Sequence, residues 1–168
     1  MSRNQGNSDR DQNKGEFIDR TVKIKRCAAV VKGGRRFSFA AMVVVGDGKG
    51  RVGFGYAKGN EVPPSVEKAK KQATAKLVTV PLEEGTIAHR VIGRYGTAQV
   101  VLLPARPGTG LIAGSAVRAV CEAAGIQNLL TKAYGTNNPV VVVKATINAL
   151  TQLRTRQEYE RLRGVSLT

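Results

Sequence analysis

The chain has 168 residues, and 42% of them are hydrophobic, which is enough for a packed core in one domain or two small ones. It carries 27 Lys and Arg against 12 Asp and Glu, and this net charge of +15 favours nucleic acid as a partner over an anionic membrane surface. No apolar run approaches the roughly 20 residues that span a bilayer, and the polar N-terminus does not resemble a secretory signal, so we expect no membrane contact.

The charge is concentrated in residues 17–80, which hold 14 cations and 4 anions. Residues 1–16 are polar, carry no net charge and show no apolar periodicity, and we expect a disordered tail there. Cys27 and Cys121 lie far apart, and there is a single histidine, so no metal or cofactor site is predicted. Both cysteines stand among apolar residues and are expected to be buried, reduced thiols.

The first module is predicted to be β-β-β-α. Its strands cover residues 17–31, 37–45 and 51–58, separated by glycine-rich turns. Ile18, Val22 and Ile24 are expected to share one face of the first strand. A helix follows with Asn60 as its cap, and its apolar stripe comprises Val62, Val66, Ala69, Ala73 and Leu77. We expect this domain to cover residues 17–80.

The second module is expected over residues 81–155. Strands are predicted at 87–94, 98–103 and 126–134, and a helix at 112–124 that Gly125 terminates. Residues 140–143 are four valines with strand propensity, but an N-cap, Pro139 and a helical spacing of apolar residues favour a helix. Residues 156–168 are predicted to be a charged C-terminal extension. The fold class is therefore α+β, with two small α/β domains.

Two glycine-rich segments carry cations. The segment 32–36 places three cations and two glycines at a hairpin tip, which suits phosphate contact, although an ordinary solvated turn is the alternative. The segment 48–53 matches the dinucleotide-binding pattern G-x-G-x-x-G, but a strand follows it instead of a helix. We interpret it as a second hairpin, carrying Lys49 and Arg51.

Catalysis is not indicated. His89 has no catalytic partner at a recognisable spacing, and no pair of carboxylates suggests acid–base chemistry. The loop 107–110 precedes a helix and faintly resembles the phosphate loop of small-molecule kinases. However, residues 81–168 contain no Asp and five Glu, which argues against a kinase. A free RNA chaperone or regulator is the other rival hypothesis.

Four blocks in order, Val31–Phe39, Val44–Tyr56, Gly108–Gly114 and Lys132–Pro139, closely resemble the bacterial small-subunit ribosomal protein five family. The resemblance implies a first domain similar to double-stranded-RNA-binding domains, although no helix precedes its first strand. It also implies a second, two-layer domain with a left-handed βαβ crossover.

The same resemblance implies a structural, non-enzymatic role. The expected partners are small-subunit ribosomal RNA, messenger RNA near its entry channel, and ribosomal proteins four and eight. The implied functions are support of subunit assembly and of decoding accuracy. The expected location is the cytoplasmic ribosome, with an organelle ribosome of bacterial type as the alternative.

The predicted site residues form two sets. Those expected to bind ribosomal RNA are Lys23, Lys25, Arg26, Lys32, Gly33, Gly34, Arg35, Arg36, Phe37, Lys49, Arg51, Lys58, Lys68, Lys70, Lys71, Lys132 and Asn137. Those expected to face a protein partner are Arg106, Gly108, Thr109, Gly110 and Arg118.

Overall fold

The computed structural model describes residues 17–165, so the tail predicted for residues 1–16 and the last three residues lie outside the described part. The elements are β1 (Ile18–Val31), β2 (Gly34–Gly46), β3 (Arg51–Gly59), α1 (Val62–Thr74), β4 (Val78–Thr79), β5 (Val91–Tyr95), β6 (Ala98–Pro104), β7 (Leu111–Ile112), α2 (Ser115–Ala124), β8 (Leu129–Tyr134), α3 (Pro139–Thr151) and α4 (Arg156–Arg163).

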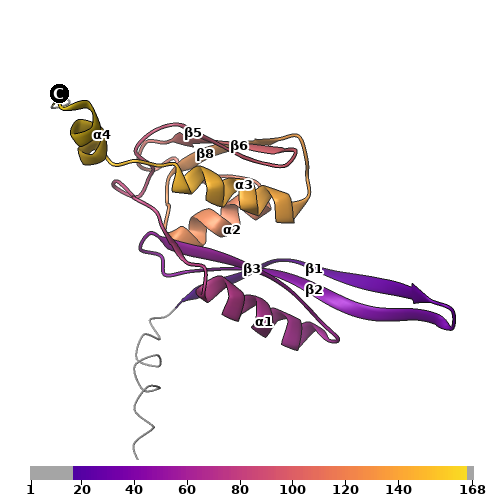
Figure 1. The fold of residues 1–168 in the computed structure, drawn as a ribbon. Helices are drawn as coiled ribbons and strands as arrows, with labels where there is room; N and C mark the ends of the chain where they lie inside the picture. Colours follow the sequence, from indigo (N-terminus) through magenta and orange to yellow (C-terminus); the bar gives the residue numbers. More distant parts are fainter. Residues whose placement is uncertain (1–16, 166–168) are drawn as a thin grey trace, which may run out of the picture.

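Two four-stranded sheets and the helices between them form stacked layers (Figure 1). The first sheet has the order β1-β2-β3-β4 and the second β5-β6-β8-β7. Helix α1 covers the outer face of the first sheet, and α2 and α3 lie between the two sheets. The α+β class with two small α/β modules is therefore confirmed.

The second half of strand β2, from Ala40 to Gly46, is buried on both faces. Its alternate side chains Val43 and Val45 pack toward α1. Met42 and Val44 point the other way, into a core that continues through α2 and α3 to the second sheet. Because one strand contributes to both cores, the two modules share apolar packing.

Glycines on the strands allow the helices to approach closely. A Cβ at Gly53 or Gly55 of β3 would collide with the backbone carbonyl oxygens of Ala73 and Ala69 in α1. Gly93 of β5 has the same relation to Ala145 in α3. The close backbone approach lets small residues of the helices, such as Ala69 and Ala73 of α1, be fully buried against the sheets.

The predicted strands and helices of the second module occur in the predicted order, and the cap of α3 explains why its valine run is helical. Asn138 caps α3 by accepting a hydrogen bond from the Val140 N–H at 3.3 Å, and Pro139 occupies the first turn. The valine run is therefore helical, with Val143 fully buried. Strands β7 and β8 run parallel with α2 between them, which is a βαβ unit. The left hand of this crossover stays a prediction.

Two predicted helix starts were wrong. Glu61, not Asn60, is the N-cap of α1, and no side chain caps it because Pro63 and Pro64 occupy the positions whose N–H groups a cap would bind. Leu77 lies beyond the end of this helix. Helix α2 starts at Ser115 rather than Ile112, because Leu111 and Ile112 pair with β8 instead.

Other boundaries also differ from the predictions. Residues 87–90 and 126–128 precede β5 and β8 rather than belonging to them. A short strand, β4, was not predicted, and most of the supposed C-terminal extension is the helix α4. A β-bulge between Thr21 and Lys23 places Val22 against the shared core, whereas Ile24 remains 41% exposed, so the predicted common face of these residues was wrong.

The two cysteines differ in burial. Cys121 is fully buried, as predicted, and burial raises the pKa of its thiol to about 12. Cys27 lies on β1 and is only half-buried, so its predicted burial was wrong. Strand β1 is the edge of its sheet and has no helix over this part.

Replacement of Gly55 by Ala should lower the free energy of unfolding by about 2–3 kcal/mol, because the added methyl group forces α1 away from β3. Urea denaturation followed by circular dichroism measures this loss. Gly33→Ala is the control, since nothing lies within 4 Å of its Cβ position, and its change should stay within about 1 kcal/mol. Equal stability of the two variants would contradict the close packing of α1.

Thiol labelling should distinguish the two cysteines. At pH 8 a pKa near 12 leaves Cys121 with about a thousandfold less thiolate than an ordinary thiol, so only Cys27 should react in the folded protein. Both should react in denaturant. A Cys27→Ser variant should show no fast-reacting thiol until it unfolds, and rapid labelling of that folded variant would refute the burial of Cys121.

Candidate nucleic-acid interface

The β1–β2 hairpin projects beyond the rest of its sheet (Figure 1). Strand β3 pairs with β2 only from Phe39 onward, so residues 27–31 and 34–38 form a two-stranded ribbon without a third strand. The ribbon extends about 16 Å past the sheet. Lys32 and Gly33 form the turn, and Gly34 has a φ of 136°, which glycine adopts readily. Three of the predicted residues, Lys32, Gly33 and Gly34, thus stand at a free tip.

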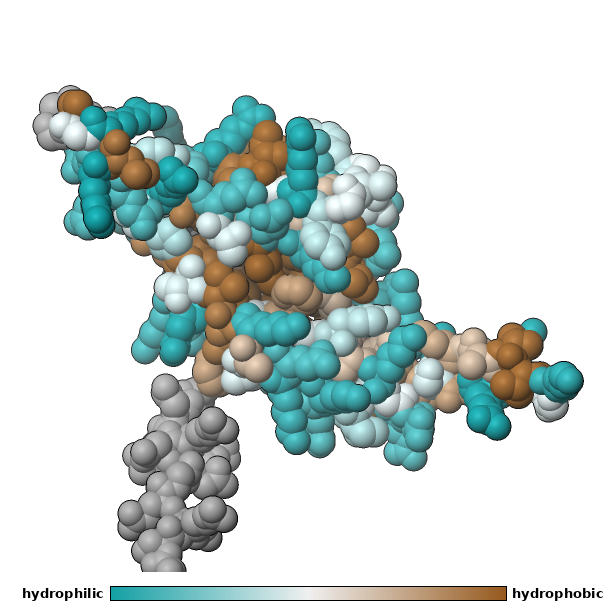
Figure 2. Space-filling view, viewed as in Figure 1, coloured by the Kyte–Doolittle hydropathy of each residue, from teal (hydrophilic) through white to brown (hydrophobic). Residues whose placement is uncertain are grey.

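The ribbon presents cations on both faces. Arg35 pairs with Val30, Phe37 with Ala28 and Phe39 with Arg26, so these residues share one face. On that face the Arg26 guanidinium lies 4.6 Å from the centre of the Phe37 ring, which is 50% exposed. Arg36 is one residue out of phase and lies on the opposite face. Figure 2 shows exposed apolar side chains close to the tip, where Val30 is 78% exposed.

A second group of cations continues the Arg36 face along the sheet. Lys25 and Lys58 both pair with Ala40 of β2, from opposite sides, and Lys23 pairs with Met42. Tyr56, next to Lys58 on this face, is 38% exposed. Sequence reasoning missed Tyr56, although its alternation with the glycines of β3 was a usable signal.

The lysines of α1 are partly committed to ion pairs. Lys70 pairs with Asp19 of β1 at 2.8 Å, across an exposed surface. Lys68 and Lys71 are exposed and lie three residues apart, on neighbouring positions of the helix surface. Of the three predicted residues, these two are the better placed for a phosphate.

Lys49 and Arg51 do not join the ribbon. The turn that carries them starts at Gly46, which pairs with Ile18 at the other end of the sheet, about 40 Å from the tip. This turn docks on the C-terminus of α2, where the N–H groups of Gly48 and Gly50 donate to the carbonyls of Ala123 and Ala124 at 3.0 and 2.9 Å. These bonds satisfy carbonyls that the helix leaves without partners. The segment is therefore a packing contact that connects the two modules.

Asp47 holds this turn together. It accepts hydrogen bonds from the backbone N–H groups of Lys49 and Arg51 and, at 2.6 Å, from Nε of Arg51. Burial alone would raise the pKa of Asp47, but these hydrogen bonds and the Arg51 charge lower it below its ordinary value. Arg51 is consequently neutralised within the chain.

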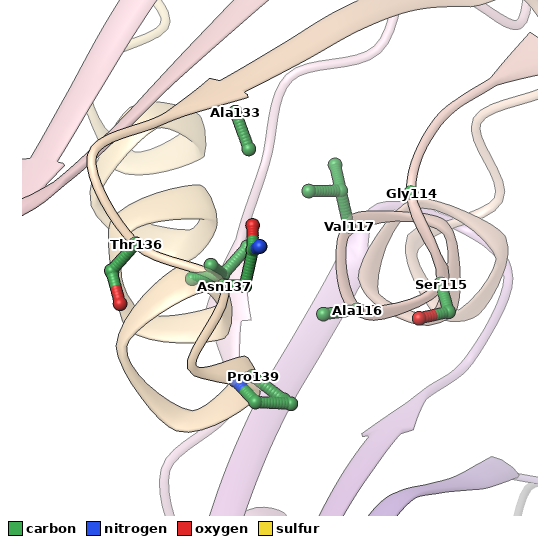
Figure 3. A pocket seen from close by; sticks show the side chains of 9 residues that line it. Gly114, Ser115, Ala116, Val117, Ala133, Thr136, Asn137 and Pro139 are labelled. Carbon is green, nitrogen blue, oxygen red and sulfur yellow. The ribbon is translucent and has the colours of Figure 1, made fainter.

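In the second module, Lys132 and Asn137 are separated. Lys132 pairs with Val101 and lies on the sheet face away from the helices, exposed to solvent. Asn137 reaches into a cavity of about 260 Å³ between the starts of α2 and α3 (Figure 3). Ala116 and Val117 form its opposite wall, and Ser115 and Thr136 also line it.

Four of the five residues predicted to face a protein partner, Arg106, Gly108, Thr109 and Gly110, lie in a loop before β7, and the fifth, Arg118, lies in α2. The Thr109 N–H donates to the carbonyl of Arg106 in a turn, and the Gly110 N–H donates to Oδ1 of Asn128 at 3.0 Å. Arg118 of α2 bonds the carbonyl of Leu111. Gly108 has open space around its Cβ position. The loop is therefore held at Gly110 by the bond to Asn128 and is unhindered at Gly108.

Within residues 17–165, no group of three or more His, Cys, Asp or Glu could hold a metal ion. In the same part of the chain, no helix is both long and apolar enough to cross a membrane.

Comparison with known proteins covers both modules. Residues 17–81 match the family model described as the N-terminal domain of ribosomal protein S5, and residues 93–163 match its C-terminal domain. The chain is 68% identical over 150 residues to a protein of Rhodopirellula baltica, covering 89% of this chain and 85% of the relative. Relatives from Syntrophobacter fumaroxidans and Alteromonas mediterranea are 56% and 49% identical, over 89% and 94% of this chain and 90% and 95% of their own lengths. All three bear the name small ribosomal subunit protein uS5.

Ribosomal proteins are the class that these matches define, so the chain is a structural component and not an enzyme. Within that class, the chain belongs to the ribosomal protein S5 family. The resemblance seen in the four sequence blocks is thereby confirmed.

Replacement of Asp47 by Asn should lower the free energy of unfolding by about 1–2 kcal/mol at pH 7, because two backbone N–H groups and Arg51 lose a charged acceptor. A lowered folded pKa means that this stability is present above the unfolded value near 3.9 and is lost as pH falls below it. Urea denaturation of both proteins at pH 7 and about pH 3 tests this.

The matched control is Glu67→Gln on the exposed surface of α1, which should change stability by less than about 0.5 kcal/mol. A difference between wild type and Asp47→Asn that persists unchanged in acid would show that the carboxylate charge is not the cause.

Proposed function

We propose that the chain is a structural constituent of the small ribosomal subunit in cytoplasmic ribosomes, and that its first module binds ribosomal RNA. The relatives named small ribosomal subunit protein support the assignment to this subunit. The observation that carries RNA binding is the charge of the hairpin. Residues 20–46 contain seven cations and no carboxylate, and their ribbon stands free of the body.

The contacts follow from the two faces of the ribbon. Lys32 at the turn and Arg35 on one face neutralise phosphates, with Phe37 available for stacking on the Arg35 face. Arg36, Lys25 and Lys58 lie on the other face. Lys68 and Lys71 add a separate phosphate contact from α1. Neutralised phosphates release counterions, which drives the association. The role is static: the protein fixes the relative placement of RNA segments during assembly.

The finer assignments are also proposals. The loop from Arg106 to Gly110, with Arg118, faces ribosomal protein four, and the chain lies beside ribosomal protein eight. Its basic surface approaches messenger RNA near the entry path and so contributes to decoding accuracy. The bond that holds Gly110 and the open space around Gly108 support a protein contact of defined shape at this loop.

The double variant Arg35→Gln, Arg36→Gln tests the proposal. Filter binding to a small-subunit ribosomal RNA fragment should show roughly 10- to 100-fold weaker affinity and a salt dependence reduced by about two phosphate contacts. The fold should persist, because both side chains are exposed. The charge-matched control Arg94→Gln, Arg161→Gln changes two exposed arginines outside the ribbon and should bind within about threefold of wild type.

Unchanged affinity of the ribbon variant would exclude the hairpin as the RNA contact. Sedimentation of cell lysate through a sucrose gradient tests the assembly itself. The protein should remain with the small subunit after a high-salt wash. Recovery at the top of the gradient would instead support a free RNA regulator.

A further inference from the structure

The C-terminal helix α4 has no buried residue, and one histidine attaches it to the body. The backbone N–H of Arg154 donates to Nε2 of His89 at 3.3 Å, and the His89 ring meets the Tyr159 ring edge to face at 5.7 Å. Because an N–H can only donate, Nε2 carries no proton. The proton is then on Nδ1, which donates to the carbonyl of Arg90 at 3.0 Å.

An open cleft of about 630 Å³ lies between α4 and the start of β5. Its walls include Arg90, Thr151, Gln152, Arg154 and Tyr159. In Figure 1, α4 stands away from the sheets, at the opposite end of the molecule from the β1–β2 ribbon. The cleft is therefore a surface separate from the one assigned to ribosomal RNA above.

Arg90 and Arg154 line this cleft, and Arg163 lies beside the Tyr159 ring that forms part of its wall. Arg154 and Arg163 lie 6.0 and 5.4 Å from the centre of the Tyr159 ring. Across residues 17–165, no carboxylate oxygen lies within 4.0 Å of the charged groups of Arg90, Arg154 or Arg163. The acidic side chains of α4 have other partners: Glu158 bonds the Thr155 N–H, and Glu160 pairs with Arg156.

These groups fit one ligand chemistry. A guanidinium stacked on an aromatic ring keeps its N–H edge free for a phosphate. An aromatic ring beside such cations is also a surface on which an unpaired base stacks, whereas the bases of a duplex are already stacked on each other. An acidic protein segment would satisfy the guanidiniums through its carboxylates, but it has no flat ring to stack on a guanidinium plane, as a base does.

We infer that the α4 cleft binds an unpaired nucleotide of RNA, with Arg90 and Arg154 at its phosphate and the Arg163–Tyr159 pair against its base. This inference rests on the proposed RNA-binding function and extends it to a second site. Two contacts at opposite ends let one protein hold two RNA segments at a fixed separation.

The test uses the full chain and a fluorescein-labelled oligouridylate of about 12 nucleotides, which forms no duplex. Fluorescence anisotropy should show that Arg90→Gln and Arg163→Gln each weaken binding about fivefold and each reduce the salt slope by about 0.7. Arg90 lies outside α4, so its variant leaves the helix in place. The matched control is Arg161→Gln, since Arg161 is exposed and lies about 200° around the helix from Tyr159. Its affinity should stay within about twofold of wild type.

Equal affinities of the three single variants would overturn the inference. Dependence on Arg90 and Arg163 seen with an oligoglutamate peptide but not with oligouridylate would also overturn it, because the cleft would then be a protein site. Binding of the wild-type protein to the ribosomal RNA fragment distinguishes failure of this inference from failure of the proposed function. Failure of wild type to bind the ribosomal RNA fragment refutes that function, whereas intact fragment binding with no Arg90 effect on oligouridylate refutes this inference only.

Discussion

The structure depends on the burial of β2 from both sides. A strand of the first sheet with one wet face would leave the modules as separate bodies joined by a linker. Here Met42 and Val44 belong to the core of the second module, and the turn after β2 bonds the end of α2. The ion pair of Arg20 with Glu122 at 3.2 Å adds a polar contact across the same junction. The ribbon is therefore carried by a rigid support rather than by a flexible domain.

Local signals predicted the elements whose ends are fixed locally. Asn138 and Pro139 located α3 despite four consecutive valines, and Gly125, with a φ of 88°, ended α2 as expected. The failures occurred where pairing over long sequence distances decides the outcome. Leu111 and Ile112 have apolar side chains that suit a first helical turn, but β8 offers them strand partners. The capping box of Thr155 and Glu158 was present in the sequence and would have revealed α4.

The sequence predicted which residues are cationic, but not which of them lie together on the surface of the protein. Charge counting found the cations of residues 17–80, but strand register decides which of them lie together, and the bulge at Val22 shifts that register. Ion pairs with Asp19 and Asp47 occupy Lys70 and Arg51. The pair of Asp19 with Lys70 joins residues about 50 positions apart, and no local pattern shows it. The α4 cleft brings together His89 and Arg154, which are 65 residues apart.

The unsupported ribbon has a length that the rest of the fold does not determine. None of residues 27–38 belongs to either core, so inserted residues there would disturb no packing. One extra residue in each strand would lengthen the hairpin by about 3.3 Å and exchange the faces that the arginines occupy. Two extra residues in each strand would restore the faces and add about 7 Å. The reach of the hairpin can therefore change in evolution in paired steps while the remainder of the protein stays constant.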